Sequence, residues 1–187
     1  MNVKKTFLLS FCRVGDSVDV NSKFLLGEKP ILPVKSLRYN GFHIDSNLSW
    51  KHHSNIISAK IARGVGILRR LKHILPERTL RTTYFAIIYP YISYGCLVWS
   101  INFYVNYKRV QILQNKAARI IGKYVKSVKD TSARFKFLRL LNIGQIRDYR
   151  TAGFGFNYVH NLVPETFNEF YCLRSSVHEH DTRIWDD

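Results

Sequence analysis

The sequence predicts a mainly α-helical protein with a small antiparallel β element at its N-terminus. From residue 49 onward, apolar residues recur at every third or fourth position, which is the period of a helix that buries one face. Before residue 45, short apolar runs are separated by glycine and proline, a pattern typical of short strands and turns. The chain has 187 residues, of which 46% are hydrophobic and 14% aromatic, so it can bury a core and is not a disordered basic tail.

Residues 1–48 are expected to contain two or more short antiparallel strands. Residues 6–11 form the first apolar run, and Gly27-Glu28 marks a turn. Residues 36–44 alternate around Asn40-Gly41, the dipeptide most typical of a two-residue hairpin turn. A β-hairpin is therefore predicted over this stretch.

A long amphipathic helix is predicted from Ser49 to about Leu75. Ser49 is a residue type that caps helix N-termini, because its side chain accepts a hydrogen bond from the first turn. Trp50 is expected to pack at the start of this helix. The predicted buried stripe consists of Ile57, Ile61, Val65, Leu68, Leu71 and Leu75.

A second helix is predicted to begin at Pro76-Glu77, since a first helical turn does not need the N–H group that proline lacks. It must bend or break at Pro90. Gly122 is the expected C-terminal cap of the next helix. The further helices are expected over residues 105–121, 132–141 and 143–161, within a helical domain of residues 49–172 followed by a polar tail, residues 173–187.

The charge of the chain is concentrated in its centre. The whole sequence has 29 Lys and Arg against 13 Asp and Glu, a net charge of +16, but residues 51–126 alone hold fourteen basic residues against Glu77. Solvated helix faces normally mix both signs, so this imbalance favours contact with nucleic-acid phosphates over a merely solvated surface. The candidate contacts are Lys60, Arg63, Arg69, Arg70, Lys72, Lys108, Arg109, Lys116, Arg119 and Lys123.

Other classes of protein and site are disfavoured. The three cysteines are widely spaced, which excludes a disulfide framework and a zinc ribbon and fits an intracellular, nuclear or cytoplasmic protein that is not secreted. The apolar stretch of residues 84–99 is shorter than the about 20 residues of a membrane span. His52 and His53, or His178 and His180 with Cys172, are too few for a zinc site, so no metal ligand is expected in this chain.

An aromatic cluster that begins in the second helix and continues beyond Pro90 has two interpretations. It can stack on nucleic-acid bases, or it can form part of the core. Proline and glycine within the cluster favour the core. The residues concerned are Tyr84, Tyr89, Tyr91, Tyr94 and Trp99.

Over about residues 1–171, an ordered series of segments resembles the reverse transcriptases of non-LTR retrotransposons of the jockey and LINE type. Each segment is a weak signal alone, but their order and spacing together are specific. The segments are RYNGFHID at 38–45, NLSWKHH at 47–53, GILRRL at 66–71, IYPYISYG at 88–95, VWS at 98–100 and LQNKAARII at 113–121.

The resemblance implies a role for each part of the chain. Residues 2–6 are similar to the family's motif D at the end of the polymerase palm, which implies that Lys5 lies near the incoming nucleotide of an intact enzyme. Tyr39, Asn40 and Gly41 are similar to the Tyr-Leu-Gly of the primer-grip hairpin, with asparagine in place of leucine. Residues from Trp50 onward resemble the helical thumb and the connection behind it.

The resemblance places the catalytic aspartates of the family upstream of Met1. Two Mg2+ ions are therefore implied only for the intact polymerase, and no cofactor or catalytic residue is expected in this chain. The sequence thus predicts a fragment of an RNA-directed DNA polymerase that grips an RNA or RNA–DNA duplex, with the polymerase palm as a second partner and no membrane. The alternatives are a non-catalytic RNA- or DNA-binding module and a decayed remnant without function.

Overall fold

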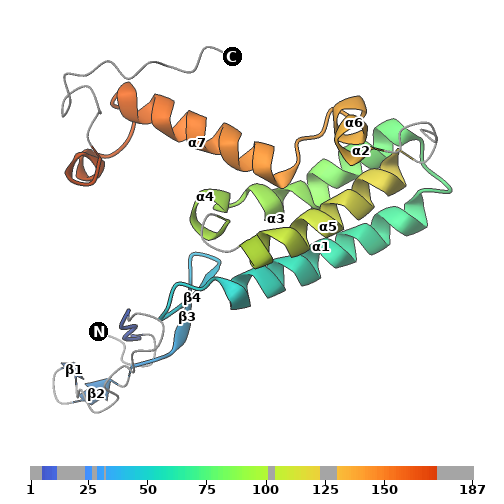
Figure 1. Ribbon diagram of the computed structural model, residues 1–187. Helices are drawn as coiled ribbons and strands as arrows, with labels where there is room; N and C mark the ends of the chain where they lie inside the picture. The colour runs from blue at the N-terminus through green and yellow to red at the C-terminus, as the bar shows by residue number, and fades with distance from the viewer. Residues whose placement is uncertain are drawn as a thin grey trace. The chain divides into compact units, whose positions relative to one another are not determined.

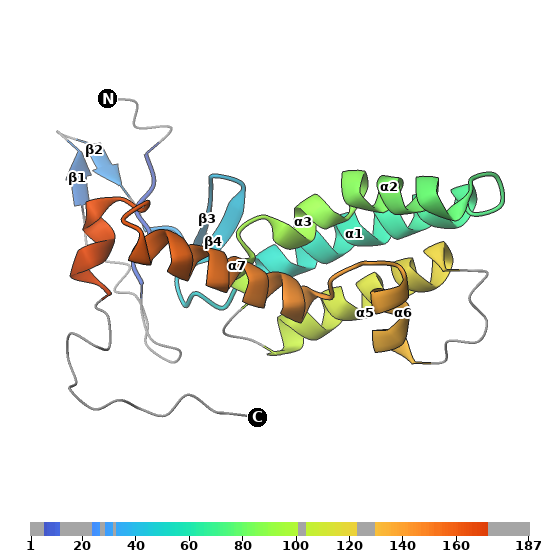
Figure 2. The ribbon, with the colours of Figure 1, turned by 90° about the horizontal axis from the view of Figure 1, so that it is seen from above.

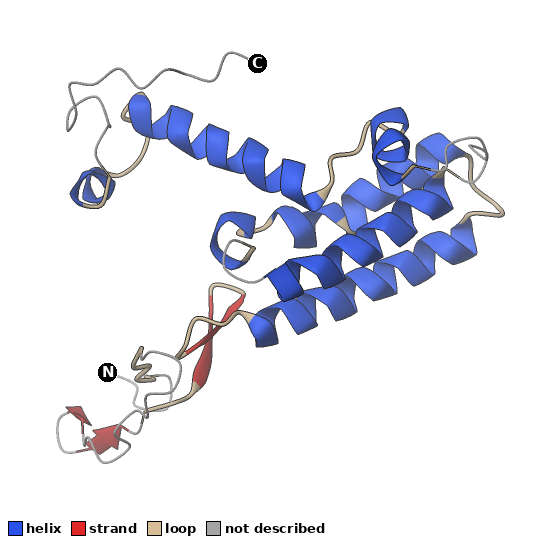
Figure 3. Ribbon diagram, viewed as in Figure 1, coloured by secondary structure: helices blue, strands red, loops and turns tan. Residues whose placement is uncertain are grey.

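The computed structural model describes residues 6–11, 24–26, 29–31, 33–100, 104–122 and 130–171. It divides into two compact units, Met1–Asp148 and Tyr149–Asp187, and each is described by itself. Most of the described chain is helical, and its strands lie before residue 46 (Figures 1 and 3). The predicted fold class is therefore confirmed.

The N-terminal strands form two antiparallel pairs, β1 with β2 and β3 with β4. Asn40 and Gly41 connect the second pair with φ values of 46° and 82°, the left-handed conformation that both residues of a type I′ turn require. The predicted hairpin is thus confirmed. The predicted run at residues 6–11 makes one bridge, between Leu8 and Pro33, and the turn at Gly27-Glu28 lies outside the described residues. The strands are β1 (Phe24–Leu26), β2 (Lys29–Ile31), β3 (Ser36–Tyr39) and β4 (Phe42–Asp45).

Helix α1 (Lys51–Leu71) begins directly after the second hairpin. Its N-cap is Trp50, which has a left-handed φ of 56° and is buried, as expected for a residue that packs at the helix start. The carboxylate of Asp45, at the end of β4, accepts hydrogen bonds from the N–H groups of Ser49 and Trp50 at 2.8 and 3.0 Å. The prediction of Ser49 as the N-cap is therefore wrong by one residue, because Trp50 occupies that position, while the Ser49 hydroxyl accepts a hydrogen bond of 3.4 Å from the Lys51 N–H group.

Helix α1 packs between α2 (Glu77–Ile87) and α5 (Tyr104–Ile121). It runs in the same direction as α5 and opposite to α2 (Figures 1 and 2). Ile61 and Leu68 of α1 are fully buried there, and so is Val110 of α5. The helix ends four residues earlier than predicted. Of the predicted stripe, the structure buries Ile57, Ile61, Val65 and Leu68 and half-buries Leu71 and Leu75.

The chain after α2 breaks into two short helices, α3 (Tyr89–Ser93) and α4 (Cys96–Trp99). The interruption predicted near Pro90 is confirmed, and Pro90 itself occupies the first turn of α3. Gly95 connects α3 to α4 with a φ of 56°. Such a sharp connection requires a left-handed residue, which glycine adopts without steric cost.

The aromatic cluster is divided between the core and the surface. Tyr84 and Trp99 are fully buried, so the core interpretation is confirmed for them. Tyr91 and Tyr94 are 38% and 55% exposed, so it is wrong for these two. Both exposed rings have partners outside the core, since Tyr94 stacks on Phe42 and Lys60 lies over Tyr91. Tyr89 is half-buried and packs against the core.

Side chains cap the last two α-helices, α6 (Thr131–Phe137) and α7 (Ile143–Val159), which lie within or close to their predicted ranges. The carboxylate of Asp130 accepts hydrogen bonds from two N–H groups of the first turn of α6. At α7, Asn142 and Gln145 each accept a hydrogen bond from the other's N–H group, at 2.9 and 3.0 Å. This reciprocal arrangement is a capping box and fixes where α7 begins.

A buried polar contact joins α2, α5 and the segment before α7. The Gln114 amide nitrogen donates to the Tyr84 hydroxyl and to the Leu141 carbonyl oxygen, both at 2.8 Å. Burial raises the pKa of Tyr84 to about 12, so this phenol stays neutral at physiological pH. The contact therefore holds three elements together without burying a charge.

The second unit is organised around aromatic rings. It comprises the C-terminal part of α7 and a 3-10 helix, η2 (Glu165–Glu169). Phe154 of α7 contacts Phe167 of η2 with ring centroids 5.5 Å apart, and Tyr171 contacts Phe154 and Tyr158, each with centroids 5.8 Å apart. These contacts pack η2 and Tyr171 against the C-terminal part of α7.

Candidate nucleic-acid interface

Eight of the predicted phosphate contacts are exposed side chains of α1 and α5. Lys72, directly after α1, is half-buried, whereas Lys123 and Lys5 lie outside the described residues. We call the eight exposed residues the α1–α5 basic face. Its members are Lys60, Arg63, Arg69 and Arg70 of α1 and Lys108, Arg109, Lys116 and Arg119 of α5.

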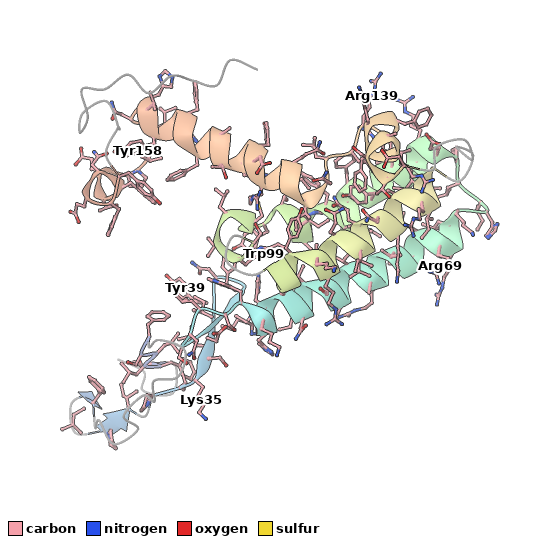
Figure 4. All side chains as sticks on the ribbon, in the orientation of Figure 1. Lys35, Tyr39, Arg69, Trp99, Arg139 and Tyr158 are labelled. Carbon is pink, nitrogen blue, oxygen red and sulfur yellow. The ribbon has the colours of Figure 1, made fainter. Side chains whose placement is uncertain are left out.

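The cations of α1 follow the helix axis. Arg63 and Arg70 are seven residues apart and therefore lie on one line along its exposed side. Arg69 projects from α1 away from the helical bundle (Figure 4). Between Arg63 and Arg70, a Cβ atom added at Gly66 would meet no atom within 4 Å. The surface around these guanidinium groups is therefore open.

The cations of α5 form a second row beside α1. Arg109 and Lys116 of α5 are also seven residues apart. The Arg109 guanidinium donates a hydrogen bond of 2.8 Å to the side-chain oxygen of Asn55, near the start of α1, so the row of α5 begins next to α1. Lys60 and Arg69 are nine residues apart and therefore point to opposite sides of α1, which spreads the cations of this helix around its exposed half.

Few carboxylates compensate this surface. Glu77 is the one acidic residue of positions 51–126. Arg147 and Asp148 form an ion pair of 3.0 Å, but both lie in α7. Lys60 of the basic face lies over the Tyr91 ring, 5.1 Å from its centroid, which is a neutral partner. The positive potential of the face is therefore largely uncompensated.

One cation of the central segment has a structural role instead. The Arg81 guanidinium in α2 donates to the carbonyl oxygens of Leu138 and Arg139 at 2.9 and 3.2 Å. It also lies over the Phe85 ring, 5.1 Å from the centroid. Arg81 thus holds the end of α6 against α2, a function that the charge count alone could not separate from phosphate contact.

The hairpin turn that resembles a primer grip lies against the helices. Tyr39 is 61% exposed, whereas the Asn40 carbonyl oxygen accepts a hydrogen bond of 2.7 Å from the Tyr94 hydroxyl. The Tyr94 ring stacks on Phe42 with centroids 4.9 Å apart. A Cβ atom at Gly41 would lie 3.7 Å from the same tyrosine. Tyr94 therefore holds the turn against the segment between α3 and α4, and no local sequence signal identifies this role.

His53 is a second residue whose importance sequence reasoning missed. It is 3% exposed, its Nδ1 accepts a hydrogen bond of 3.3 Å from the His43 N–H group, and its Nε2 has no hydrogen-bond partner in the described structure. Burial, with smaller effects of His43, Lys60 and His52, lowers the pKa of His53 to about 4. The side chain is thus a neutral link between β4 and α1.

Within the described ranges, no group of three or more His, Cys, Asp or Glu side chains could hold a metal ion. Among the helices placed by the structure, none combines the length and the apolar character that crossing a bilayer requires.

Replacing Tyr94 with phenylalanine should destabilise the hairpin turn locally. The variant keeps the stacking on Phe42 but loses the hydrogen bond to Asn40, so we expect a loss of about 1 kcal/mol in unfolding free energy. We also expect faster hydrogen exchange of the turn amides. The matched control is Tyr91→Phe, which removes a hydroxyl from an exposed tyrosine of α3, three residues before Tyr94. Equal losses in the two variants would contradict the role assigned to Tyr94.

Over 98 residues, half of its length, the chain is 32% identical to the "Probable RNA-directed DNA polymerase from transposon X-element" of Drosophila melanogaster. The matched region is 11% of the length of that protein. No family model matches the sequence, and no solved structure matches the chain. The chain thus contains a region similar to part of a transposon RNA-directed DNA polymerase.

Proposed function

We propose that this chain is the template–primer-holding, thumb-side part of the reverse transcriptase of a mobile element. The similarity to a transposon RNA-directed DNA polymerase supports the enzyme class. The α1–α5 basic face carries the proposal, because its eight exposed cations lie on two neighbouring helices with a single carboxylate in the surrounding sequence. An RNA or RNA–DNA duplex is the partner that such a surface fits.

The proposed mechanism is electrostatic. Lysine and arginine side chains bind backbone phosphates and release the counterions condensed on the duplex, which gives affinity without sequence preference. Arg69 and Arg70 of α1 and Lys116 and Arg119 of α5 are positioned for such contacts along two parallel rows. The Asn55–Arg109 bond keeps the rows in register, so the duplex meets a preorganised surface.

We assign nucleotide transfer to the intact polymerase. Its Mg2+ ions, held by palm carboxylates, supply the chemistry by stabilising the attacking and leaving oxygens. The contribution of this chain is to hold the template–primer, and the palm is its second partner. Primer extension by this chain alone, with Mg2+ or Mn2+, should therefore yield no product. Robust extension would refute the division of roles.

Duplex binding should depend steeply on salt and on the basic face. We expect Arg70→Gln/Lys116→Gln to bind an RNA–DNA duplex about tenfold more weakly than the unchanged chain at about 50 mM salt. The slope of log affinity against log salt should become shallower by about two, since each lost phosphate contact removes about 0.9. Fluorescence anisotropy between about 50 and 200 mM salt measures both quantities.

The matched control removes the same charge from other helices. Lys136→Gln/Arg150→Gln changes exposed cations of α6 and α7. It should leave the affinity within about twofold of the unchanged chain. Equal effects of the two double variants, or an affinity that does not fall with salt, would refute the proposed face.

A further inference from the structure

A group of protonatable and cationic side chains lies where the second hairpin meets α1. The rings of His43 in β4 and His52 in the first turn of α1 meet edge to face with centroids 4.9 Å apart. Arg38 of β3 is the direct cross-strand partner of His43, so their side chains share one face of the hairpin. Lys60 lies two turns further along α1 and acts electrostatically on both His43 and His53.

These groups extend the α1–α5 basic face onto the hairpin. At 3.6 residues per turn, His52, Lys60 and Arg63 fall within a sector of about 80° around α1. His52, Lys60 and Arg38 are all exposed, and His43 is half-buried. Half-buried Ile56 and exposed Ile67 fall in the same sector, so a ligand lying along α1 would meet cations and apolar side chains together on its way to the hairpin.

The charges around His43 favour an anion as the ligand. The neighbouring carboxylate, Asp45, already accepts hydrogen bonds from the N–H groups of Ser49 and Trp50 and from the Ser49 hydroxyl. Arg38 and Lys60 would repel a metal cation. Burial, followed by the positive neighbours His52, Arg38 and Lys60, lowers the pKa of His43, so bringing these groups together disfavours the charged imidazole until an anion arrives.

We propose that Arg38, His43, His52 and Lys60 form a binding site for a backbone phosphate of the nucleic-acid duplex. The site rests on the proposed function and adds to it a place where the duplex reaches the hairpin. Imidazolium N–H groups and the two permanent cations are donors that match phosphate oxygens.

The site should couple duplex binding to proton uptake. A bound phosphate favours the protonated imidazole of His43 and raises its pKa. Between the free and bound pKa values of His43, binding takes up a proton, so affinity rises as the pH falls. His53, which also faces His43, stays neutral over this interval because its pKa is about 4.

The direct experiment follows the histidines of the full chain by NMR. With an RNA–DNA duplex of about 16 base pairs present in saturating amount, we expect the pKa of His43 to rise by about one unit and the ring signals of His52 to shift. Inorganic pyrophosphate should raise the pKa of His43 in the same direction, since it engages the site without needing the rest of the face. An unchanged His43 pKa with both probes would overturn the proposal.

Binding measurements provide the second test. Between about pH 8 and pH 6, the unchanged chain should gain about tenfold in affinity for the duplex, and His43→Gln/His52→Gln should gain less than about twofold. The control, His73→Gln/His160→Gln, changes two exposed histidines elsewhere and should keep the tenfold gain. A gain that survives His43→Gln/His52→Gln would overturn the site.

The outcomes separate this site from the proposed function. Salt-dependent duplex binding with unresponsive histidines would refute the phosphate site and leave the holding function standing. A His43 pKa that rises with pyrophosphate, together with a duplex affinity that Arg70→Gln/Lys116→Gln leaves unchanged, would support the site and refute the basic face.

Discussion

Replacing Gly95 with alanine should lower the free energy of unfolding by about 3 kcal/mol. The φ of 56° at this position costs a residue with a Cβ about 1 kcal/mol. The added Cβ would also lie 2.2 Å from an atom of the Phe42 ring. Relieving such a steric overlap costs about 1–3 kcal/mol. Since Phe42 stacks on Tyr94, its displacement should also release the hairpin turn. Urea unfolding measures the first effect and hydrogen exchange at residues 39–42 the second.

Gly66→Ala is the matched control for this substitution. Gly66 lies in α1, where an added Cβ meets no atom within 4 Å, so alanine should be neutral or stabilise the helix by up to about 1 kcal/mol. A double variant, Phe42→Ala/Gly95→Ala, separates the two causes. It should lose less stability than the two single variants together, because removing the ring relieves the overlap. Strict additivity would contradict the steric account.

Lowering the pH from 7 to 4 should remove about 3 kcal/mol of stability through His53 alone. Its pKa is about 4 in the folded chain, against 6.5 for the free side chain, and burial is the largest cause. In this interval the unfolded chain holds a proton on His53 and the folded chain does not. The free energy of unfolding therefore decreases as the pH decreases, by about 1.4 kcal/mol for each unit of difference between the two pKa values. The decrease stops when His53 takes up a proton in the folded chain as well.

A variant that cannot titrate tests this assignment. In His53→Asn the amide oxygen can still accept the hydrogen bond from the His43 N–H group. Urea unfolding at about pH 7 and pH 4 should show a loss smaller by about 3 kcal/mol than in the unchanged chain. His73→Asn, at an exposed position, should keep the full loss. If His53→Asn remains as acid-sensitive as His73→Asn, another group carries the effect.

Local patterns allowed the prediction of the helices and the second hairpin. Asn40-Gly41 specifies a type I′ turn by its own backbone preference, and the stripe of Ile57, Ile61, Val65 and Leu68 follows from helical period alone. These features depend on residues close in the sequence. The charge of the central segment was likewise visible from composition.

Contacts between distant residues were not predictable. Asn55 and Arg109 are 54 residues apart, so only the folded chain shows that α5 packs beside the start of α1. Tyr94 and Asn40 are separated by the same number of residues. The predicted N-cap of α1 was wrong by one residue, since the Asp45 carboxylate of the preceding strand fixes the N–H groups of Ser49 and Trp50 and so places Trp50 at the N-cap position.

The shared direction of α1 and α5 has an electrostatic consequence. Each helix carries a partial positive charge at its N-terminus and a partial negative charge at its C-terminus. The two longest helices of the first unit, of 21 and 18 residues, both begin at the end where the hairpin lies, and the opposing α2 has only 11. Both N-termini therefore add partial positive charge at the hairpin end, within about one turn of each helix. An anion bound at that end would be favoured by the helix termini as well as by the side chains.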